Sequence, residues 1–258
     1  MLTIDKYLRP ATLDEAYEAA QKKNSVILGG MLWLRLGNRR IGTAIDLSAL
    51  GLDTVEDIGD AYRIGAYTTL RTLETHGELN ALTGNVLRDA VKSIVGVQFR
   101  NLATVGGSVF GRFGFSDVVT TFLALGASVE LYETGVVPLE EFCAMGKVND
   151  ILTHVILPKT SCTAAYAAQR NSATDFPVLN VCAVRRENAL TVAVGARPLG
   201  ALAYRYATGE IGSAAAVAED IAARTVFASN TRASEEYRRH LCRVLVRRTV
   251  EAVTKEEN

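Results

Sequence analysis

The segment Arg100–Asp117, RNLATVGGSVFGRFGFSD, contains glycine at positions 106, 107, 111 and 114. Glycines this closely spaced indicate backbone with positive φ, or backbone that another group approaches closely. A second pair, Gly29-Gly30, follows the short apolar segment 25–28, which is typical of a strand. Two glycine turns that each close a strand can direct backbone N–H groups toward a diphosphate from two sides. The sequence therefore predicts a diphosphate cradle built from main-chain amides.

Three polar side chains accompany the second of these turns. The hydroxyls of Thr104 and Ser108 are additional donors for a phosphate, and Asp117 is placed to accept from a ribose hydroxyl. Each also has a purely local interpretation: the hydroxyls satisfy the turn, and Asp117 caps a helix that starts at Val118. Together with the glycines, the ligand interpretation is favoured. The spacing matches neither GxGxxG nor GxxxxGK[ST], which argues against a Rossmann or P-loop nucleotide site.

Composition narrows the class of partner. The 258 residues suffice for one large domain or two modest ones, and Lys plus Arg equals Asp plus Glu at 28 each. This balance argues against a nucleic-acid partner held by bulk charge. No apolar run reaches the ~18 residues of a membrane span, and Asp5 and Lys6 interrupt the N-terminal stretch where an export signal is apolar. We expect a cytoplasmic chain without a membrane span.

The residues that usually carry catalysis or bind metals are scattered. The four cysteines (143, 162, 182 and 242) form no CxxC pair, and the three histidines (76, 154 and 240) do not cluster. We therefore expect reduced, mostly buried thiols, no metal site and no catalytic residue on this chain. A diphosphate cradle without an evident acid or base suits a redox cofactor, because such a cofactor carries the reaction itself.

The chain changes character near Pro158. Before it, helices and strands are mixed. We expect a helix at 12–23 that opens with a capping box of Thr12 and Glu15, a helix at 68–73 with Thr68 or Thr69 as its N-cap, and helices at 87–95 and 118–125. We expect strands at 26–28, 44–47, 62–64 and 128–132, a turn at 53–58, and a short helix or strand at 31–36. After it, strands at 164–169, 178–185 and 190–194 suit an antiparallel sheet, followed by helices at 213–227 and from Ser234 onward. The last helix carries arginine at 238, 239, 243, 247 and 248. Because these spread around the helix, a solvated or subunit-facing surface is favoured over a phosphate site.

The motifs taken together resemble a known family. The loop Gln98–Gly107, then Ser116-Asp117 and the segment 123–127 (LALGA), resemble the FAD-binding medium subunit of molybdenum hydroxylases, the xanthine dehydrogenase and carbon monoxide dehydrogenase type. Leu28-Gly29-Gly30, the segment 138–142 (PLEEF) and the segments 232–234 and 236–239 are also similar to family segments, in the same order. The resemblance spans nearly the whole chain.

The resemblance implies an α+β fold of two domains. Residues 1–158 would form an FAD-binding domain like that of vanillyl-alcohol oxidase (PCMH type), with subdomains of about 1–57 and 58–158 and FAD extended between them. Residues 159–258 would form a smaller α+β domain of antiparallel sheet and helices.

The resemblance also assigns site residues by position. The residues that would line the first loop are Leu28, Gly29, Gly30, Met31, Leu32 and Trp33. The pyrophosphate would be held by Thr104, Gly106, Gly107 and Ser108. The adenosine ribose would be bound by Asp117, and the flavin ring would lie near Ile156 and Leu157. Met31-Leu32 stands where Thr-Asp is usual, Ser108 where Asn is usual, and the segment 112–114 (RFG) where small residues and Pro are usual. Backbone amides survive all of these changes, and a diphosphate is held mainly by amides. Arg112 either adds positive charge beside the diphosphate or is an ordinary surface arginine.

For function, the resemblance implies an FAD-dependent oxidoreductase subunit. Electrons would come from a molybdenum cofactor on a large subunit, cross two [2Fe–2S] clusters on a small subunit, and reach FAD on this chain, which passes them to NAD⁺ or another acceptor. Two alternatives stay open: an assembly subunit that kept the fold but lost FAD, and a stand-alone flavin enzyme.

Overall fold

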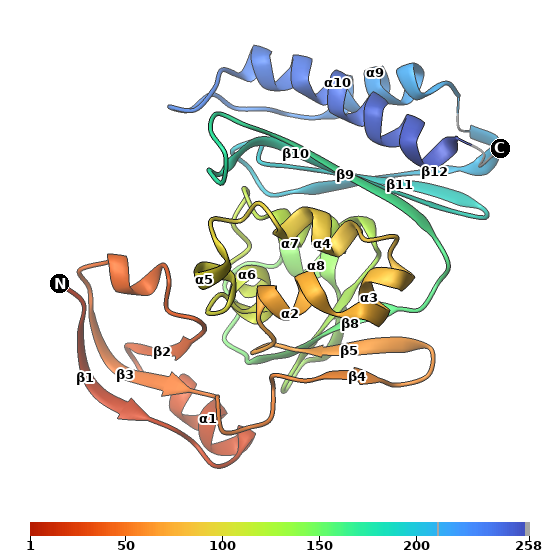
Figure 1. Cartoon of the computed structure of the whole chain (residues 1–258). Helices are drawn as coiled ribbons and strands as arrows, with labels where there is room; N and C mark the ends of the chain where they lie inside the picture. The colour runs from red at the N-terminus through yellow and green to blue at the C-terminus, as the bar shows by residue number, and fades with distance from the viewer. Residues whose placement is uncertain (211, 256–258) are drawn as a thin grey trace. The chain divides into compact units, whose positions relative to one another are not determined.

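The computed structural model describes residues 1–210 and 212–255 (Figure 1). It divides into two compact units that are interleaved along the chain: unit 1 comprises Met1–Thr72, Val97–Gly111 and Ala127–Leu157, and unit 2 comprises Leu73–Gly96, Arg112–Gly126 and the chain from Pro158 onward. Both units mix helices with sheets, so the predicted α+β class is confirmed. The domain boundaries expected at residues 57 and 158 stay a prediction, because compact units and domains need not coincide.

Unit 1 begins with a small parallel sheet. Its strands, in the order β1-β3-β2, are β1 (Thr3–Leu8), β3 (Arg40–Asp46) and β2 (Ser25–Leu28), accompanied by α1 (Leu13–Ala20) and the short 3₁₀ helix η1 (Leu34–Leu36). The predicted cap of α1 is confirmed: Thr12 Oγ1 accepts from the Glu15 amide at 3.2 Å. Ala16 and Ala19 of this helix are buried in one cluster with Ile45 and Leu47. Small alanines let the helix approach the sheet closely, which holds the end of β2 in place.

The rest of unit 1 surrounds a five-stranded sheet. Its order is β4-β5-β8-β6-β7, from β4 (Val55–Asp57), β5 (Ala61–Gly65), β8 (Leu152–Pro158), β6 (Ser128–Leu131) and β7 (Gly135–Pro138). Helices α5 (Val97–Arg100), α6 (Val105–Phe110) and α8 (Leu139–Ala144) belong to the same unit, and α2 (Leu70–Thr75) begins in it. As expected, a threonine caps α2, since Thr69 Oγ1 accepts from the Thr72 amide at 3.0 Å.

A charged network lies on this sheet. Glu130 and His154 are direct cross-strand neighbours on β6 and β8, and His154 Nδ1 lies 3.0 Å from Glu130 Oε2. Arg63 of β5 binds the same carboxylate with Nε at 2.8 Å and Nη2 at 3.1 Å. Burial of His154, which is 5% exposed, lowers its pKa below the usual 6.5, and the charge of Arg63 lowers it further. Burial alone raises the pKa of Glu130, but its bonds to Arg63 outweigh burial and lower that pKa overall.

Stability should therefore fall as the pH drops below about 6.5. The unfolded chain then takes up a proton on His154 that the folded chain does not, because the folded pKa is the lower one. In the wild type, we expect the free energy of unfolding to fall by on the order of 1 kcal/mol between pH 7 and 5.5 because of His154, measured by urea unfolding at both pH values. In His154→Gln this fall should be absent, whereas His240→Gln, at an exposed histidine, should show the same fall as the wild type. An unchanged loss in His154→Gln would contradict this assignment.

Unit 2 is a four-stranded antiparallel sheet with helices on both faces. The order is β12-β11-β10-β9, from β12 (Leu202–Ala207), β11 (Ala189–Gly195), β10 (Pro177–Arg186) and β9 (Thr163–Arg170). Helices α9 (Ala214–Arg224) and α10 (Glu235–Thr254) cover one face, and α7 (Asp117–Ala124) and α4 (Val86–Val91) cover the other (Figure 1). The unit also contains α3 (Gly77–Leu82) and the short η2 (Thr208–Glu210). The three predicted strands are confirmed, and β12 adds a fourth.

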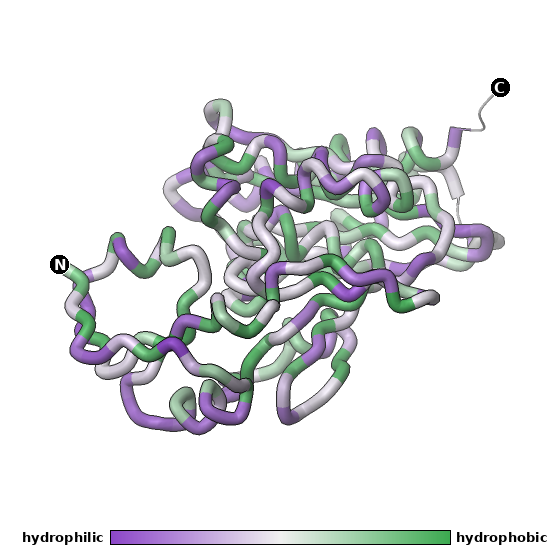
Figure 2. The backbone as a smooth tube through the Cα atoms, turned by 60° about the horizontal axis from the view of Figure 1, so that its bottom comes forward, coloured by the Kyte–Doolittle hydropathy of each residue, from purple (hydrophilic) through white to green (hydrophobic). Residues whose placement is uncertain are grey.

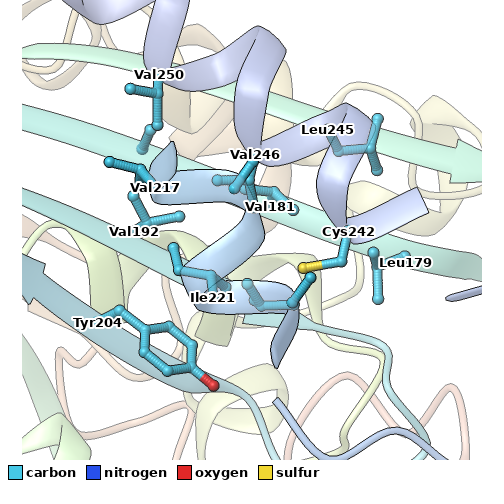
Figure 3. Close-up of a cluster of buried hydrophobic side chains, with 14 of the residues drawn as sticks. Leu179, Val181, Val192, Tyr204, Val217, Ile221, Cys242, Leu245, Val246 and Val250 are labelled. Atoms are coloured by element: carbon cyan, nitrogen blue, oxygen red, sulfur yellow. The ribbon is translucent and has the colours of Figure 1, made fainter. Parts of the chain in front are cut away.

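The core of unit 2 explains the long apolar run of β10. Eight consecutive residues of this strand, from Pro177 to Val184, are buried, because helices pack on both of its faces. Figure 3 shows Val181 and Val192 of the sheet packed with Ile221 of α9 and with Val246 and Val250 of α10. A strand with only one covered face would instead alternate between buried and exposed residues.

Arg238 corrects the expectation that the arginines of the closing helix are solvated. It is only 1% exposed. Its guanidinium donates to Val178 O at 3.0 Å, to Ala228 O and Ala233 O at 2.7 Å, and to Asn230 Oδ1 at 2.7 Å. Burial, followed by the charge of Arg232, lowers the pKa of Arg238. This side chain therefore holds the segment before α10 against β10.

Several other helices and strands differ from the sequence-based expectation. The helix expected over 87–95 ends at Val91, and Val95 has a φ of 48°. The turn expected at 53–58 contains β4, and β1 and β7 were not predicted.

Of the four cysteines, all free, only Cys182 and Cys242 are buried. Among the described residues, no helix is long and apolar enough to cross a membrane. Hydrophobic and hydrophilic stretches alternate along the backbone tube in Figure 2.

Candidate functional site

The two glycine turns of unit 1 pack against each other. The first glycine turn, Gly29-Gly30, directly follows β2, and the second, Gly106-Gly107, lies in the first turn of α6. A Cβ placed on Gly29 would lie 3.0 Å from Thr104 Oγ1 and 3.4 Å from Gly107 Cα. The two turns thus meet backbone to backbone, although Gly30 and Gly106 are 76 positions apart in the sequence.

Two of these positions admit no side chain at all. A Cβ on Gly30 would lie 1.8 Å from Leu102 O, and one on Gly106 would lie 2.7 Å from Ala66 Cβ and 2.8 Å from Ala66 O. Real atoms do not approach so closely, so the backbone would have to move. Glycine is therefore required at both positions by close approach and not by an unusual φ.

The amides of the two turns differ in their partners. In the second turn, the Gly106 amide donates to Ala66 O at 2.7 Å and the Gly107 amide to Thr104 Oγ1 at 3.1 Å. In the first turn, the hydrogen bonds of the described residues include no acceptor for the amides of Gly30 and Met31. Met31 has a φ of 58°, a left-handed conformation that residues other than glycine adopt infrequently. The first turn therefore has two amides available to a ligand, which fits the predicted diphosphate.

The hydroxyls expected to assist have local partners. Thr104 is the N-cap of α6, and Ser108 Oγ donates to Thr104 O at 2.9 Å. The local interpretation of both hydroxyls thus holds in this structure, and their contact with a phosphate stays a prediction.

The remainder of the first loop is apolar and packed. Leu28 and Leu32 are buried, Met31 is half-buried against the cluster of Leu28 with Ile41 and Ala44, and Trp33 is 47% exposed. Met31 therefore packs the loop onto the parallel sheet, and Leu32 beside it is buried, so neither side chain of this unusual pair offers a hydrogen bond to a ligand.

Ile156 and Leu157 lie on β8 and not on the glycine turns. Consecutive residues of a strand face opposite sides of the sheet, so their side chains cannot both face one ring. Leu157 is 1% exposed and belongs to the core, whereas Ile156, opposite Ser128, is half-buried. Of the two, Ile156 is the better candidate to contact a ligand through its side chain.

Asp117 lies in unit 2, where it is the centre of a buried polar cluster. Ser116, not Asp117, caps α7, since Ser116 Oγ accepts from the Val119 amide at 3.1 Å; the capping interpretation of Asp117 is wrong. The Asp117 carboxylate, 5% exposed, accepts from Arg170 Nη2 at 2.9 Å, from Asn180 Nδ2 at 2.9 Å and from the Tyr166 hydroxyl. Its contact with a ribose stays a prediction.

The partners of Asp117 were not foreseen from the sequence. Asn180 is fully buried in the apolar strand β10, and burial followed by the charge of Asp117 raises the pKa of Tyr166 well above its usual value. A lone asparagine inside the apolar run PVLNVCAV was the available signal, because a buried amide needs a polar partner.

The unusual segment 112–114 also belongs to unit 2. A Cβ on Gly114 would lie 2.4 Å from Leu199 O, and Gly114 O accepts from the Ala196 amide at 2.6 Å. Phe113 stacks on Phe115 with ring centroids 5.2 Å apart. The segment is therefore held against the loop after β11.

One further segment contacts both glycine turns and was missed. Residues 66–70 follow β5; Thr68 O accepts from the Val105 amide at 2.8 Å, and the Leu70 amide donates to Ala103 O at 2.8 Å. The Tyr67 hydroxyl donates to Leu28 O, the carbonyl directly before the first turn. Gly65-Ala66, two small residues at the end of a strand, were the only sequence signal of such a close contact.

The chain is similar to known proteins over nearly its full length. Residues 2–160 match the family model described as the FAD binding domain in molybdopterin dehydrogenase. The protein YgfM of Escherichia coli K12 is 24% identical, and the nicotine 6-hydroxylase medium subunit of Paenarthrobacter nicotinovorans is 25% identical; the matches cover 94% and 95%, respectively, of both chains. Carbon monoxide dehydrogenase from Hydrogenophaga pseudoflava has the same fold, with a TM-score of 0.83 at 20% identity over 96% of both chains.

Proposed function

Because the chain belongs to the family of FAD-binding domains of molybdopterin dehydrogenases, we propose that it is the FAD-binding, electron-transferring medium subunit of a molybdenum hydroxylase complex. Its partners in this proposal are a large subunit with the molybdenum cofactor and a small subunit with [2Fe–2S] clusters. FAD bound to this chain accepts their electrons and passes them to NAD⁺ or another acceptor. The proposed compartment is the cytoplasm, which four free cysteines suit.

The observation that carries this proposal is the pair of glycine turns. They leave the amides of Gly30 and Met31 available next to Gly29, which lies against the exposed Gly107, and none of these three glycines has a side chain that could block a diphosphate. We assign the pyrophosphate to these turns together with Thr104, Gly106 and Ser108. The remaining assignments are the adenosine ribose to Asp117 and the flavin ring to the neighbourhood of Ile156 and Leu157.

No residue of this chain is assigned a bond-making step. Its described residues contain no group of three or more His, Cys, Asp or Glu side chains that could hold a metal ion. The work of the protein in this proposal is to bind and orient the cofactor, and the apolar packing of Met31 on the parallel sheet keeps the first turn in place while it does so.

Purification of the native complex tests the proposal. We expect the chain to co-purify with a molybdenum-containing and an iron–sulfur subunit, to carry flavin absorbance, and to lose that absorbance when the substrate of the molybdenum site is added anaerobically. A complex that contains no flavin and takes up no added FAD would show an assembly subunit instead. Turnover by the isolated chain would show a stand-alone flavin enzyme.

A further inference from the structure

Tyr67 lies where the first glycine turn leaves the parallel sheet. Its hydroxyl donates to Leu28 O and accepts from the Leu47 amide at 2.9 Å. Leu28 is the last residue of β2 and pairs with Asp46, the last residue of β3, so Leu47 and Gly29 are the first residues beyond the ladder. One phenol oxygen therefore bridges the ends of two adjacent strands at the point where they separate.

The Tyr67 hydroxyl stays protonated and is held in place by the rest of the residue. Burial, the largest cause, raises the pKa of Tyr67 to about 12, so the hydroxyl keeps its proton and donates throughout the neutral range. The ring packs in the cluster of Ile45, Leu47 and Leu52, and the Tyr67 amide donates to Leu52 O at 2.7 Å. Both ends of the residue are therefore fixed, and the hydroxyl position is not adjustable.

Tyr67 is also tied to the second glycine turn through its neighbours. Ala66 O accepts from the Gly106 amide at 2.7 Å, and Thr68 O accepts from the Val105 amide at 2.8 Å. A displacement of either turn relative to residues 66–68 must break one of these bonds. Residues 66–68 thus set the spacing of the two turns.

From this geometry we infer that Tyr67 is a positioning residue for FAD: its hydroxyl fixes the end of β2 relative to the end of β3 and thereby places the first glycine turn at the distance that the diphosphate requires. The inference rests on the proposed function for the identity of the ligand. Without the hydroxyl, Leu28 O and the Leu47 amide can satisfy each other directly, because both are aimed at the same point. That new bond would draw the end of β2 toward β3 and move Gly29 with it.

The consequence is a specific signature for Tyr67→Phe. Since the two backbone groups regain a partner, the urea midpoint of the FAD-free chain should stay near the wild-type value, while the affinity for FAD falls about tenfold. Trp33, the single tryptophan of the chain and four residues after Gly29, reports the position of the turn without any ligand. Its accessibility to acrylamide in the FAD-free chain should therefore change.

The matched control is Tyr132→Phe. Tyr132, like Tyr67, belongs to unit 1. Its hydroxyl donates to the carboxylate of Asp14 and not to a residue at the glycine turns. Its removal should leave the quenching of Trp33 and the affinity for FAD at wild-type values.

The experiment is a titration of the full-length wild type and both variants with FAD, followed by Trp33 emission, together with acrylamide quenching and urea unfolding without FAD. Wild-type Trp33 quenching and FAD affinity in Tyr67→Phe would overturn the inference. So would a loss of affinity that is matched by an equal loss of stability, because the residue would then be merely structural. If no chain binds FAD, the proposed function fails, whereas changed acrylamide quenching in Tyr67→Phe alone still upholds the positioning of the turn.

Discussion

Gly107→Val is expected to abolish FAD binding and to leave the chain folded. Gly107 is exposed, lies in α6 and has no positive φ, so the only obstacle to a side chain is Thr104 Oγ1, which must shift by a few tenths of an ångström. Its Cβ would lie 3.0 Å from Thr104 Oγ1 and 4.0 Å from Gly29 Cα, and its methyl groups would extend into the space beside the two turns. A diphosphate held by backbone amides cannot share that space.

The affinity for FAD should fall by at least about a hundredfold, whereas the free energy of unfolding should change by less than about 1 kcal/mol. Quenching of Trp33 by added FAD measures the first quantity, and urea unfolding of the FAD-free chain measures the second. Gly146→Val is the control, because a Cβ there meets nothing within 4 Å. FAD retained by Gly107→Val would contradict the cradle. Gly30→Ala is a poor substitute, because its Cβ would collide with the Leu102 backbone and disturb the fold itself.

Arg238→Met should cause a large loss of stability. Methionine keeps much of the length and apolar bulk of arginine, but it leaves Val178 O and Ala228 O without their donor, whereas Ala233 O keeps the Asn230 amide. Each buried carbonyl left unpaired costs about 1–3 kcal/mol, so a total of about 2 kcal/mol or more is expected. Because Arg238 faces carbonyls and not a carboxylate, no charged partner is left uncompensated in the variant.

Denaturant unfolding followed by circular dichroism measures this loss. Arg248→Met, at an exposed position of the same helix, should change the free energy of unfolding by less than about 0.5 kcal/mol. Arg238→Lys should lie between wild type and methionine, since an ammonium group cannot donate to all of these acceptors from one planar fork. If Arg238→Met is as stable as the Arg248 variant, the network does not stabilise the fold.

Much of the local structure could be predicted from the sequence because its causes lie within a few residues. Thr12 with Glu15 predicted the start of α1, and Ser234 marked the start of α10, whereas the helix expected over 213–227 ends at Arg224. Apolar runs predicted β2, β9, β10 and β11. Strands with mixed composition, such as β1 and β4, were missed, because only pairing with β3 and β5 makes them strands.

The candidate site divides in the same way. The two glycine turns were found from the sequence, since dense glycine signals a backbone constraint wherever it occurs. Asp117 was also found, but its bonds to Arg170 and Asn180 were not, because they join residues at least 53 positions apart. Tyr67 gave no signal of its own, since a half-buried tyrosine is ordinary until both of its backbone partners are known.

By itself, the sequence determined where the backbone carries no side chain, where helices begin and which segments are apolar enough to form the core. These properties depend on the chemistry of neighbouring residues and are readable in order along the chain. Only the tertiary structure decided that Gly29 faces Gly107, that Arg238 is buried and that one phenol hydroxyl bonds to the ends of both β2 and β3. Those outcomes depend on which distant groups remain without a hydrogen-bond partner once the core has closed, and packing alone settles that.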